Sequence, residues 1–187
     1  MAHNLRDFSA DKKHRKVDDR PFGGGPGMVI QIQPIYKAVE FVKKKVTSRL
    51  GSKNKNRVIL FSTRGKKFDA KMAKRLAKYD QLILICGRYE GVDERVAQYV
   101  ADEEISIGDF VLSGGELAAA IVVDAVSRQI PGVLGKYESL EEIKGSYPVY
   151  TRPEIFVPKK GGKKWIVPKV LLSGHQKKIE EWRKSNH

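Results

Sequence analysis

The sequence predicts an α/β fold in which helices cover both faces of a parallel sheet. Continuous apolar runs at residues 58–61 and 82–86 are typical of strands that are buried on both faces, and residues 105–111 have the pattern of a third strand. Segments with apolar residues at steps of three and four follow these strands, as in amphipathic helices. Alternating strands and helices of this kind indicate a parallel α/β layer.

The first half of the chain justifies this prediction element by element. Residues 1–33 are polar and then glycine-rich, which predicts loop rather than helix or strand. Pro34 opens a helical pattern that Gly51 ends. The strand at 58–61 follows, and a helix is expected from Asp69 onward.

The second half continues the alternation and then departs from it. The strand at 82–86 precedes a short helix at 92–100, and the third strand precedes a strong helix at 116–128. After Gly135 the pattern becomes polar, until a last helix begins near Ser173. We therefore expect a folded domain at residues 1–135, a linker at 136–172 and a C-terminal helix at 173–187, in a chain of 187 residues.

Composition indicates the class of partner. The 36 Lys and Arg residues exceed the 22 Asp and Glu residues and leave a formal charge of +14, which favours a polyanion such as nucleic acid. The alternative is that the lysine-rich faces are simply solvated. No apolar stretch is long enough for a membrane span and no signal peptide is recognised, so a cytoplasmic location is expected.

Cysteine and histidine patterns exclude two classes of site. The single Cys86 cannot form an internal disulfide, and neither Cys-x-x-Cys nor His-Glu-x-x-His occurs, so no metal site is predicted. Cys86 ends an apolar run and is interpreted as a core residue rather than a nucleophile. Trp165 and Trp182 are interpreted as packing residues rather than as platforms for base stacking.

Three glycine-rich turns carry the strongest functional signal. They lie at residues 86–91, 106–109 and 112–117, at or near the ends of predicted strands, where parallel sheets bind ligands. Glycine lets the backbone adopt unusual angles and approach a flat ligand closely. Neither a P-loop nor a dinucleotide fingerprint is present. Taken alone, the glycines fit tight packing and ligand contact equally well.

Four motifs together are far more specific. They are HRKVDDRPFGGGPGM at residues 14–28, CGRYEGVDER at 86–95, SIGDFVLSGGE at 106–116 and YTRPE at 150–154. These segments closely resemble the bacterial tRNA (guanine-N1)-methyltransferase family, TrmD. The resemblance runs over nearly the whole chain. It implies an α/β fold of the SPOUT class, with a parallel sheet and a C-terminal trefoil knot, which is an exception to the rule against threaded loops.

The resemblance also implies an activity and its partners. Members of the family are homodimers that methylate N1 of the guanine at tRNA position 37, next to the anticodon, with S-adenosylmethionine as the methyl donor. The sequence leaves open whether Mg²⁺ takes part near Glu90. The residues that match the family's cofactor-binding positions are Gly87, Tyr89, Glu90, Gly91, Ser106, Ile107, Gly108, Asp109, Phe110, Val111, Leu112, Gly114 and Gly115.

Catalytic and tRNA-binding residues are carried over in the same way. Arg128 matches the family's catalytic arginine, although a cation at the end of a helix also complements the helix dipole. His14, Arg15 and Asp18 lie in the motif implied to contact tRNA, and Asp18 fits a turn-capping role as well.

The chain departs from the family in the residue expected to act as the general base. An ungapped alignment from Gly135 places Ile143 where the family has an aspartate, and isoleucine cannot accept a proton. Glu141 or Glu142 could replace it if the shortened linker shifts the register, and Glu142 is the candidate carried forward. Ser139 with Glu142 also forms a capping-box pattern. The alternative function is therefore a catalytically silent RNA-binding dimer. Family members also have a strand and a helix before the equivalent of Asn4 and a small tRNA-binding domain after the Trp182 helix, and neither is expected here.

Overall fold

The structure is a computed structural model. It describes the chain except residues 51–53, 134–144, 160 and 187, and it also leaves out the side chains of residues 46–50. The chain divides into two compact units, Met1–Leu134 and Gly135–His187. The elements of the first unit are, in order, a 3-10 turn η1 (Leu5–Phe8), β1 (Asp18–Asp19), β2 (Val29–Ile30), α1 (Ile32–Leu50), β3 (Asn56–Lys67), α2 (Ala70–Leu76), β4 (Gln81–Ile85), α3 (Glu94–Tyr99), β5 (Glu103–Ser106) and α4 (Glu116–Ser127).

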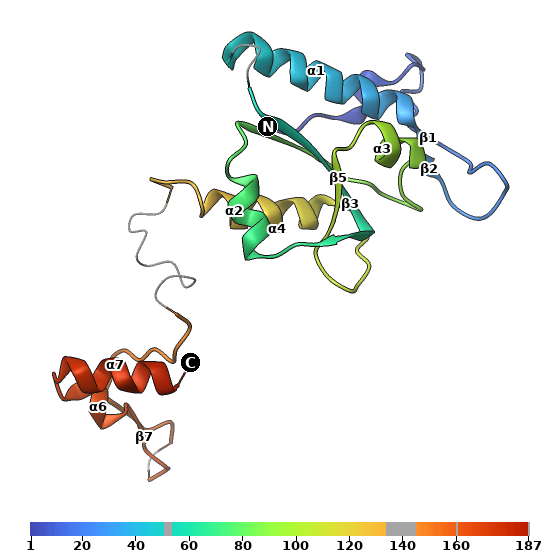
Figure 1. The fold of residues 1–187 in the computed structure, drawn as a ribbon. Helices are drawn as coiled ribbons and strands as arrows, with labels where there is room; N and C mark the ends of the chain where they lie inside the picture. Colours follow the sequence, from blue (N-terminus) through green and yellow to red (C-terminus); the bar gives the residue numbers. More distant parts are fainter. Residues whose placement is uncertain (51–53, 134–144, 160, 187) are drawn as a thin grey trace. The chain divides into compact units, whose positions relative to one another are not determined.

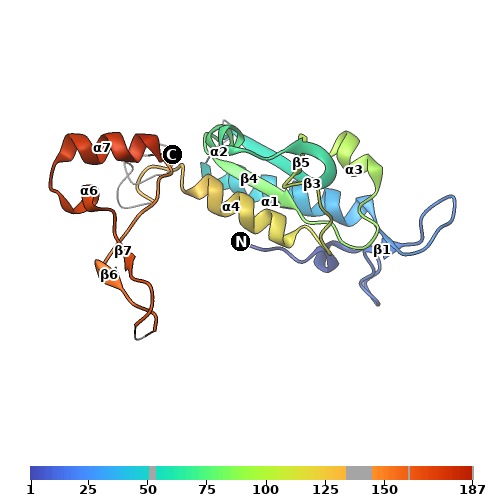
Figure 2. The same ribbon diagram turned by 90° about the horizontal axis from the view of Figure 1, so that it is seen from below.

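The first unit is the predicted α/β layer. Its three long strands are parallel and lie in the order β4-β3-β5, so β3 is central (Figure 1). Successive side chains of β3 point to opposite faces. Val58 and Leu60 enter a core with α1 and α3, while Ile59 enters a second core with α2 and α4. Helices therefore cover both faces of the sheet, as predicted (Figure 2).

Three details differ from the prediction. Residues 1–33 contain η1 and the short β1–β2 pair, in which Asp18 lies opposite Ile30, so the prediction of loop alone was wrong. The first long strand continues past residue 61 to Lys67 by pairing a second time with Ile105 and Ser106 after a register shift. The third strand ends at Ser106 instead of residue 111, because the hydroxyl of Ser106 accepts a hydrogen bond from the Gly108 N–H and closes a turn.

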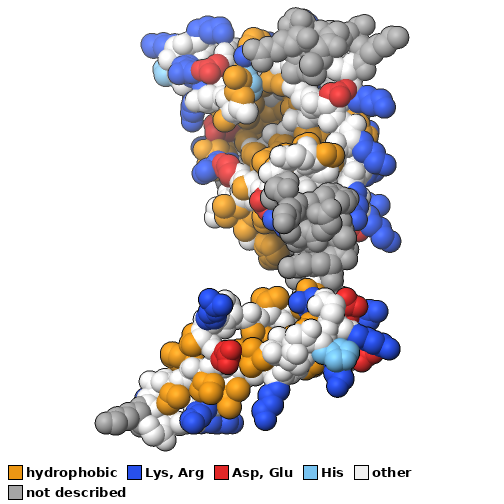
Figure 3. Space-filling view, turned by 90° about the vertical axis from the view of Figure 1, so that its left-hand side faces the viewer, with side chains coloured by type: hydrophobic (Ala, Val, Ile, Leu, Met, Phe, Trp, Pro, Cys, Tyr) orange, Lys and Arg blue, Asp and Glu red, His pale blue; other side chains and the backbone are white. Residues whose placement is uncertain are grey.

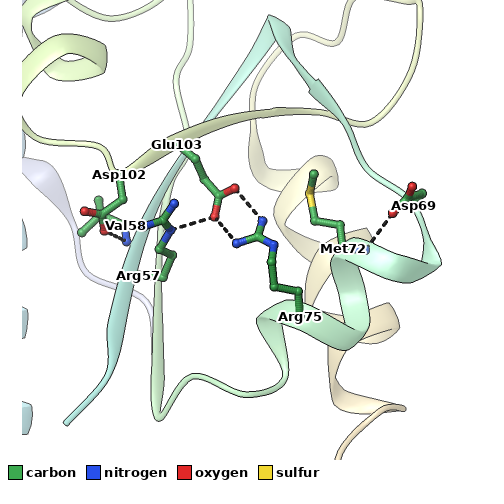
Figure 4. A network of polar contacts seen from close by, with 7 residues as sticks. All are labelled: Arg57, Val58, Asp69, Met72, Arg75, Asp102 and Glu103. Atoms are coloured by element: carbon green, nitrogen blue, oxygen red, sulfur yellow. Dashed lines mark hydrogen bonds and ion pairs between the residues drawn. The ribbon is translucent and has the colours of Figure 1, made fainter. Parts of the chain in front are cut away.

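An ion-pair network ties the strands of the sheet to α2 (Figure 4). The carboxylate of Glu103, on β5, accepts hydrogen bonds from Arg57 Nε at 2.9 Å and from Arg75 Nη2 at 2.6 Å. Burial disfavours the charged form of Glu103, but the two guanidinium groups outweigh it and hold the pKa below its usual range. Nearby, the Asp102 carboxylate accepts a 2.7 Å hydrogen bond from the Val58 N–H, and Asp69 caps α2 by accepting one from the Met72 N–H.

The second unit is small. It contains β6 (Ile155–Phe156) and β7 (Trp165–Ile166), which form an antiparallel hairpin, followed by α6 (Lys169–Leu172) and α7 (Gln176–Ser185). Ile179 of α7 is buried, and Trp182 of the same helix lies against Tyr150 with ring centroids 6.2 Å apart. Trp182 is thus a packing residue, as the sequence predicted. In the described residues of both units, no helix is long and apolar enough to cross a membrane.

Candidate functional site

The three glycine-rich turns line one pocket in the first unit. The pocket has a volume of about 380 Å³ and opens where β4 and β5 end and α4 begins. Every residue matched to the cofactor lines it except Asp109: Gly87, Tyr89, Glu90, Gly91, Ser106, Ile107, Gly108, Phe110, Val111, Leu112, Gly114 and Gly115. The topology therefore brings segments that are well separated in sequence to the carboxyl edge of a parallel sheet, where ligands of α/β proteins bind.

Close backbone contact between α4 and the end of β4 closes one side of this pocket. The Gly115 N–H donates a 2.9 Å hydrogen bond to the Gly87 carbonyl. A Cβ on Gly115 would lie 2.8 Å from Cys86 Cα, closer than side chains and backbone normally approach. Glycine at position 115 is thus required by space, and the two turns are held as one wall of the pocket.

Two ion pairs flank the pocket. Arg88 Nε donates to Glu116 Oε1 at 2.6 Å, and this bond holds the pKa of the Glu116 carboxyl below its usual range. Arg64 Nη2 donates to Glu94 Oε2 at 2.6 Å and lies 3.9 Å from Glu104 Oε2. These charged groups surround a wall made largely of glycine turns, so the pocket combines main-chain polar groups with charges of both signs.

The sequence-based site left out part of this pocket. Arg64, Glu94 and Glu104 line it, together with Arg88 and the segment Leu60–Thr63. Arg64, on the continuation of β3, and Glu104, on β5, lie outside the four motifs, whereas Glu94, at the start of α3, lies in the motif at 86–95 but was not matched to the cofactor. Asp109, in contrast, points away to form a 2.6 Å ion pair with Lys67 and is highly exposed.

The first motif lies directly beside the pocket. The Glu90 N–H donates to the Met28 carbonyl at 3.2 Å, and the Ile30 N–H donates to the Gly91 carbonyl at 3.0 Å. Within the motif, His14 lies 3.3 Å from the Asp11 carboxylate, Arg15 forms an ion pair with Asp7, and Asp18 belongs to β1. His14 and Arg15 are exposed and contact Asp11 and Asp7, whereas the end of the motif, at Met28, contacts the pocket wall.

Arg128, one of the two residues assigned to catalysis, does not line the pocket. Arg128 caps the C-terminal end of α4, whereas the pocket adjoins the N-terminal end of that helix. Twelve residues at 1.5 Å each separate the two ends by about 18 Å. Glu142, and Ile143 beside it, lie outside the described residues.

Nucleophilic and metal chemistry find little support in the described residues. Burial raises the pKa of the Cys86 thiol, and the nearby Glu116 carboxylate raises it further, which disfavours the reactive thiolate. Among the residues that the structure describes, no group of three or more His, Cys, Asp or Glu side chains is placed to hold a metal ion.

Known proteins resemble this chain along its whole length. The sequence model of the family "tRNA (Guanine-1)-methyltransferase TrmD" matches residues 1–187. The chain is 49% identical over 187 residues to the tRNA (guanine-N(1)-)-methyltransferase of Dehalococcoides mccartyi, and the match covers 97% of this chain and 70% of that protein. For the enzyme of the same name from Clostridium tetani the identity is 50%, covering 97% of this chain and 72% of that protein. For the enzyme from Carboxydothermus hydrogenoformans the identity is 48%, covering 97% and 67%.

Proposed function

Because the chain belongs to the TrmD family of tRNA (guanine-N1)-methyltransferases, we propose that it methylates N1 of guanine in tRNA, at position 37 next to the anticodon. The single pocket that collects the three glycine turns is the observation that carries this proposal. The reaction joins a methyl group to N1 and releases the N1 proton. The protein therefore has to bind a methyl donor, hold the guanine beside it and accept that proton.

S-adenosylmethionine is the proposed donor, and the pocket suits it. A volume of about 380 Å³ lies in the range of small-molecule sites, and glycine turns let main-chain groups approach a flat adenine. Twelve matched residues, all those assigned except Asp109, would surround it. When bound, S-adenosylmethionine supplies an activated methyl group. We propose further that these turns form the trefoil knot of a SPOUT fold, whose α/β sheet with flanking helices is seen here.

Arg128 and Glu142 are the proposed catalytic residues. Negative charge develops on guanine O6 as the neighbouring N1 loses its proton, and the guanidinium of Arg128 would stabilise it. The carboxylate of Glu142 would accept the proton in place of the missing aspartate. The alternative role of Glu142 in a capping box gives a different expectation: its loss would then lower stability and leave turnover intact.

We propose a homodimer, and the position of Arg128 supports it. The 18 Å or so between the two ends of α4 exceeds the reach of an arginine side chain, so Arg128 cannot serve the pocket of its own chain. One face of α4 also exposes Leu117 and Ile121, which are four residues apart. Figure 3 shows that hydrophobic side chains reach the surface of the described part of the chain. We propose that a second copy packs on this face and brings its Arg128 to the pocket.

The tRNA contacts are proposed for the exposed segment at residues 14–18. Exposed His14 and Arg15 would contact phosphates, and Asp18 would contact the nucleotide.

The domain roles remain proposals too: catalysis in residues 1–135, a connecting segment at 136–172 and a terminal helix at 173–187. A cytoplasmic location, where tRNA is modified, also stays a prediction.

Glu90, which lines the pocket, is the proposed binding site for a Mg²⁺ ion that would assist the reaction. One protein carboxylate suits a magnesium ion that keeps most of its water and binds substrate oxygens. Titration of Mg²⁺ into chelator-treated protein, followed by methyl transfer, tests this with Glu90→Gln as the matched variant.

The deciding experiment is transfer of labelled methyl from S-adenosylmethionine to an unmodified tRNA transcript with guanine 3′ of its anticodon. The control transcript carries adenine at that position. We expect transfer to the guanine form alone. A folded dimer that binds tRNA and transfers nothing would refute the enzyme and leave the silent RNA-binding dimer as the function.

A further inference from the structure

The hairpin of the second unit presents an unusual pair of aromatic side chains. Phe156 of β6 and Trp165 of β7 are register partners, so they lie on the same face of the hairpin. Their ring centroids are 5.6 Å apart and the ring planes meet at 51°. Both side chains are largely solvent-exposed, with 49% and 59% of their surface accessible. At this angle the rings cannot cover each other, so aromatic faces remain open to a ligand.

Packing within the unit does not account for this exposure. The buried side chain is Ile179 of α7, and Trp182 and Tyr150 pack together as described above. All four strand residues of the hairpin are exposed, including Ile155 and Ile166 on its other face. A two-stranded hairpin without a buried face is marginally stable, so a ligand that covers the rings would also stabilise it. Trp165 therefore differs from Trp182 and from the packing role that the sequence suggested for both.

Lysines flank the aromatic pair along the chain. Lys163 and Lys164 directly precede Trp165, Lys159 follows β6, and all three are exposed. None of them forms an ion pair with any residue that the structure describes, so their charge is available to a partner. The cores of protein interfaces are depleted in lysine, which argues against a protein as the occupant of this face. Aromatic faces next to lysines are instead the combination by which proteins bind single-stranded nucleic acid.

We infer that the β6–β7 hairpin is an RNA-binding platform for unpaired nucleotides of the tRNA substrate. A base stacks on the open face of Trp165 or Phe156, and Lys163 and Lys164 contact the adjoining phosphates. The inference rests on the proposed function, because it takes tRNA to be the substrate. It adds a substrate-binding surface outside the pocket and outside the loop at residues 14–18.

The test compares full-length variants by equilibrium binding to a fluorescently labelled tRNA transcript, without methyl transfer. Because stacking on an aromatic side chain is worth on the order of five- to 150-fold in affinity per base, we expect Phe156→Ala/Trp165→Ala to weaken binding by roughly tenfold or more. Trp165→Phe should retain most of the affinity. The matched control is Ile155→Ala/Ile166→Ala, which removes similarly exposed apolar side chains from the opposite face and should bind tRNA normally.

The charges are tested by salt dependence. Lys163→Gln/Lys164→Gln should reduce the slope of log K against log salt by about one to two, whereas Lys177→Gln/Lys178→Gln on α7 removes the same charge and should change it less. Steady-state kinetics then distinguish a role of the hairpin in tRNA binding from a role in methyl transfer. Hairpin variants should raise KM for tRNA and leave kcat and S-adenosylmethionine affinity unchanged.

Three outcomes would overturn the platform. Wild-type affinity in Phe156→Ala/Trp165→Ala, with normal methyl transfer by the parent protein, refutes the hairpin alone. Equal losses in the aromatic and isoleucine variants assign the hairpin a structural role. A weaker dimer with unchanged tRNA affinity makes this face a protein interface. If the parent protein binds tRNA through the hairpin and transfers no methyl group, the proposed function fails and the platform stands.

Discussion

Replacing Gly115 with alanine tests whether close contact between α4 and the end of β4 builds the pocket. The added Cβ would lie 2.8 Å from Cys86 Cα and 3.2 Å from the Gly87 nitrogen. Both neighbours are backbone atoms, so no side chain can rotate away to make room. Because non-bonded carbon atoms prefer 3.5–4.0 Å, the start of α4 has to move by roughly 1 Å relative to the turn.

This displacement should lower both stability and cofactor affinity. Overpacking of this kind costs about 1–3 kcal/mol in the free energy of unfolding. The same movement separates turns that together line the pocket, so we expect the Kd for S-adenosylmethionine to rise about tenfold or more. Chemical denaturation at fixed protein concentration measures the first effect, and isothermal titration calorimetry measures the second.

Gly87→Ala provides the control for stability. Its Cβ would meet only Val92 Cγ1, at the ordinary distance of 3.4 Å, so its free energy of unfolding should stay close to the parent value. A Gly115→Ala protein that unfolds like the parent and binds S-adenosylmethionine with the parent Kd would refute the reasoning.

Three further predictions follow from the site and the fold. Arg128→Ala should abolish methyl transfer and leave the Kd for S-adenosylmethionine nearly unchanged in calorimetry; full activity would remove Arg128 from the mechanism. Glu142→Gln should lower kcat well beyond any change in stability, and normal turnover in a folded variant would assign Glu142 to capping. Glu103→Gln should lower the free energy of unfolding by roughly 2 kcal/mol at neutral pH, because it removes the negative charge that accepts three hydrogen bonds from Arg57 and Arg75 in a partly exposed network. Since the pKa of Glu103 is lower in the folded protein, its contribution is present at neutral pH and is lost as the pH falls through that lowered value, so denaturation curves of parent and variant should converge in acid.

Local chemistry explains why so much of the fold and pocket was predictable from sequence. The run Val58–Phe61 has a composition typical of a strand buried on both faces, and the structure places Val58 and Ile59 in opposite cores. The glycine turns were recognisable because their backbone geometry requires glycine, and parallel strands bring such turns to one edge. These features depend on a few neighbouring residues.

Features that depend on distant pairing were not predictable in this way. The sequence could not show that β3 is central, since strand order arises from contacts between segments far apart. The apolar run that predicts this strand ends at Phe61, yet Lys66 and Lys67 continue β3 by pairing with Ile105 and Ser106. The ion pair between Arg88 and Glu116 escaped notice for the same reason: its members are 28 residues apart and meet only across the pocket.

Arg128 and the pocket lie at opposite ends of α4. A last prediction therefore tests whether Arg128 serves the pocket of its own chain or that of a second chain. If Arg128 serves its partner's pocket, an inactive Arg128→Ala chain still has a usable pocket, and an inactive Gly115→Ala chain still has a usable arginine. The two are co-refolded in equal amounts and assayed at an S-adenosylmethionine concentration too low to load the pocket of the Gly115→Ala chain. Half of the dimers are then mixed, and each mixed dimer holds one intact site of two. We therefore expect about one quarter of the parent activity from two inactive proteins. If Arg128 acted on the pocket of its own chain, no site in the mixture would be complete and no activity would return.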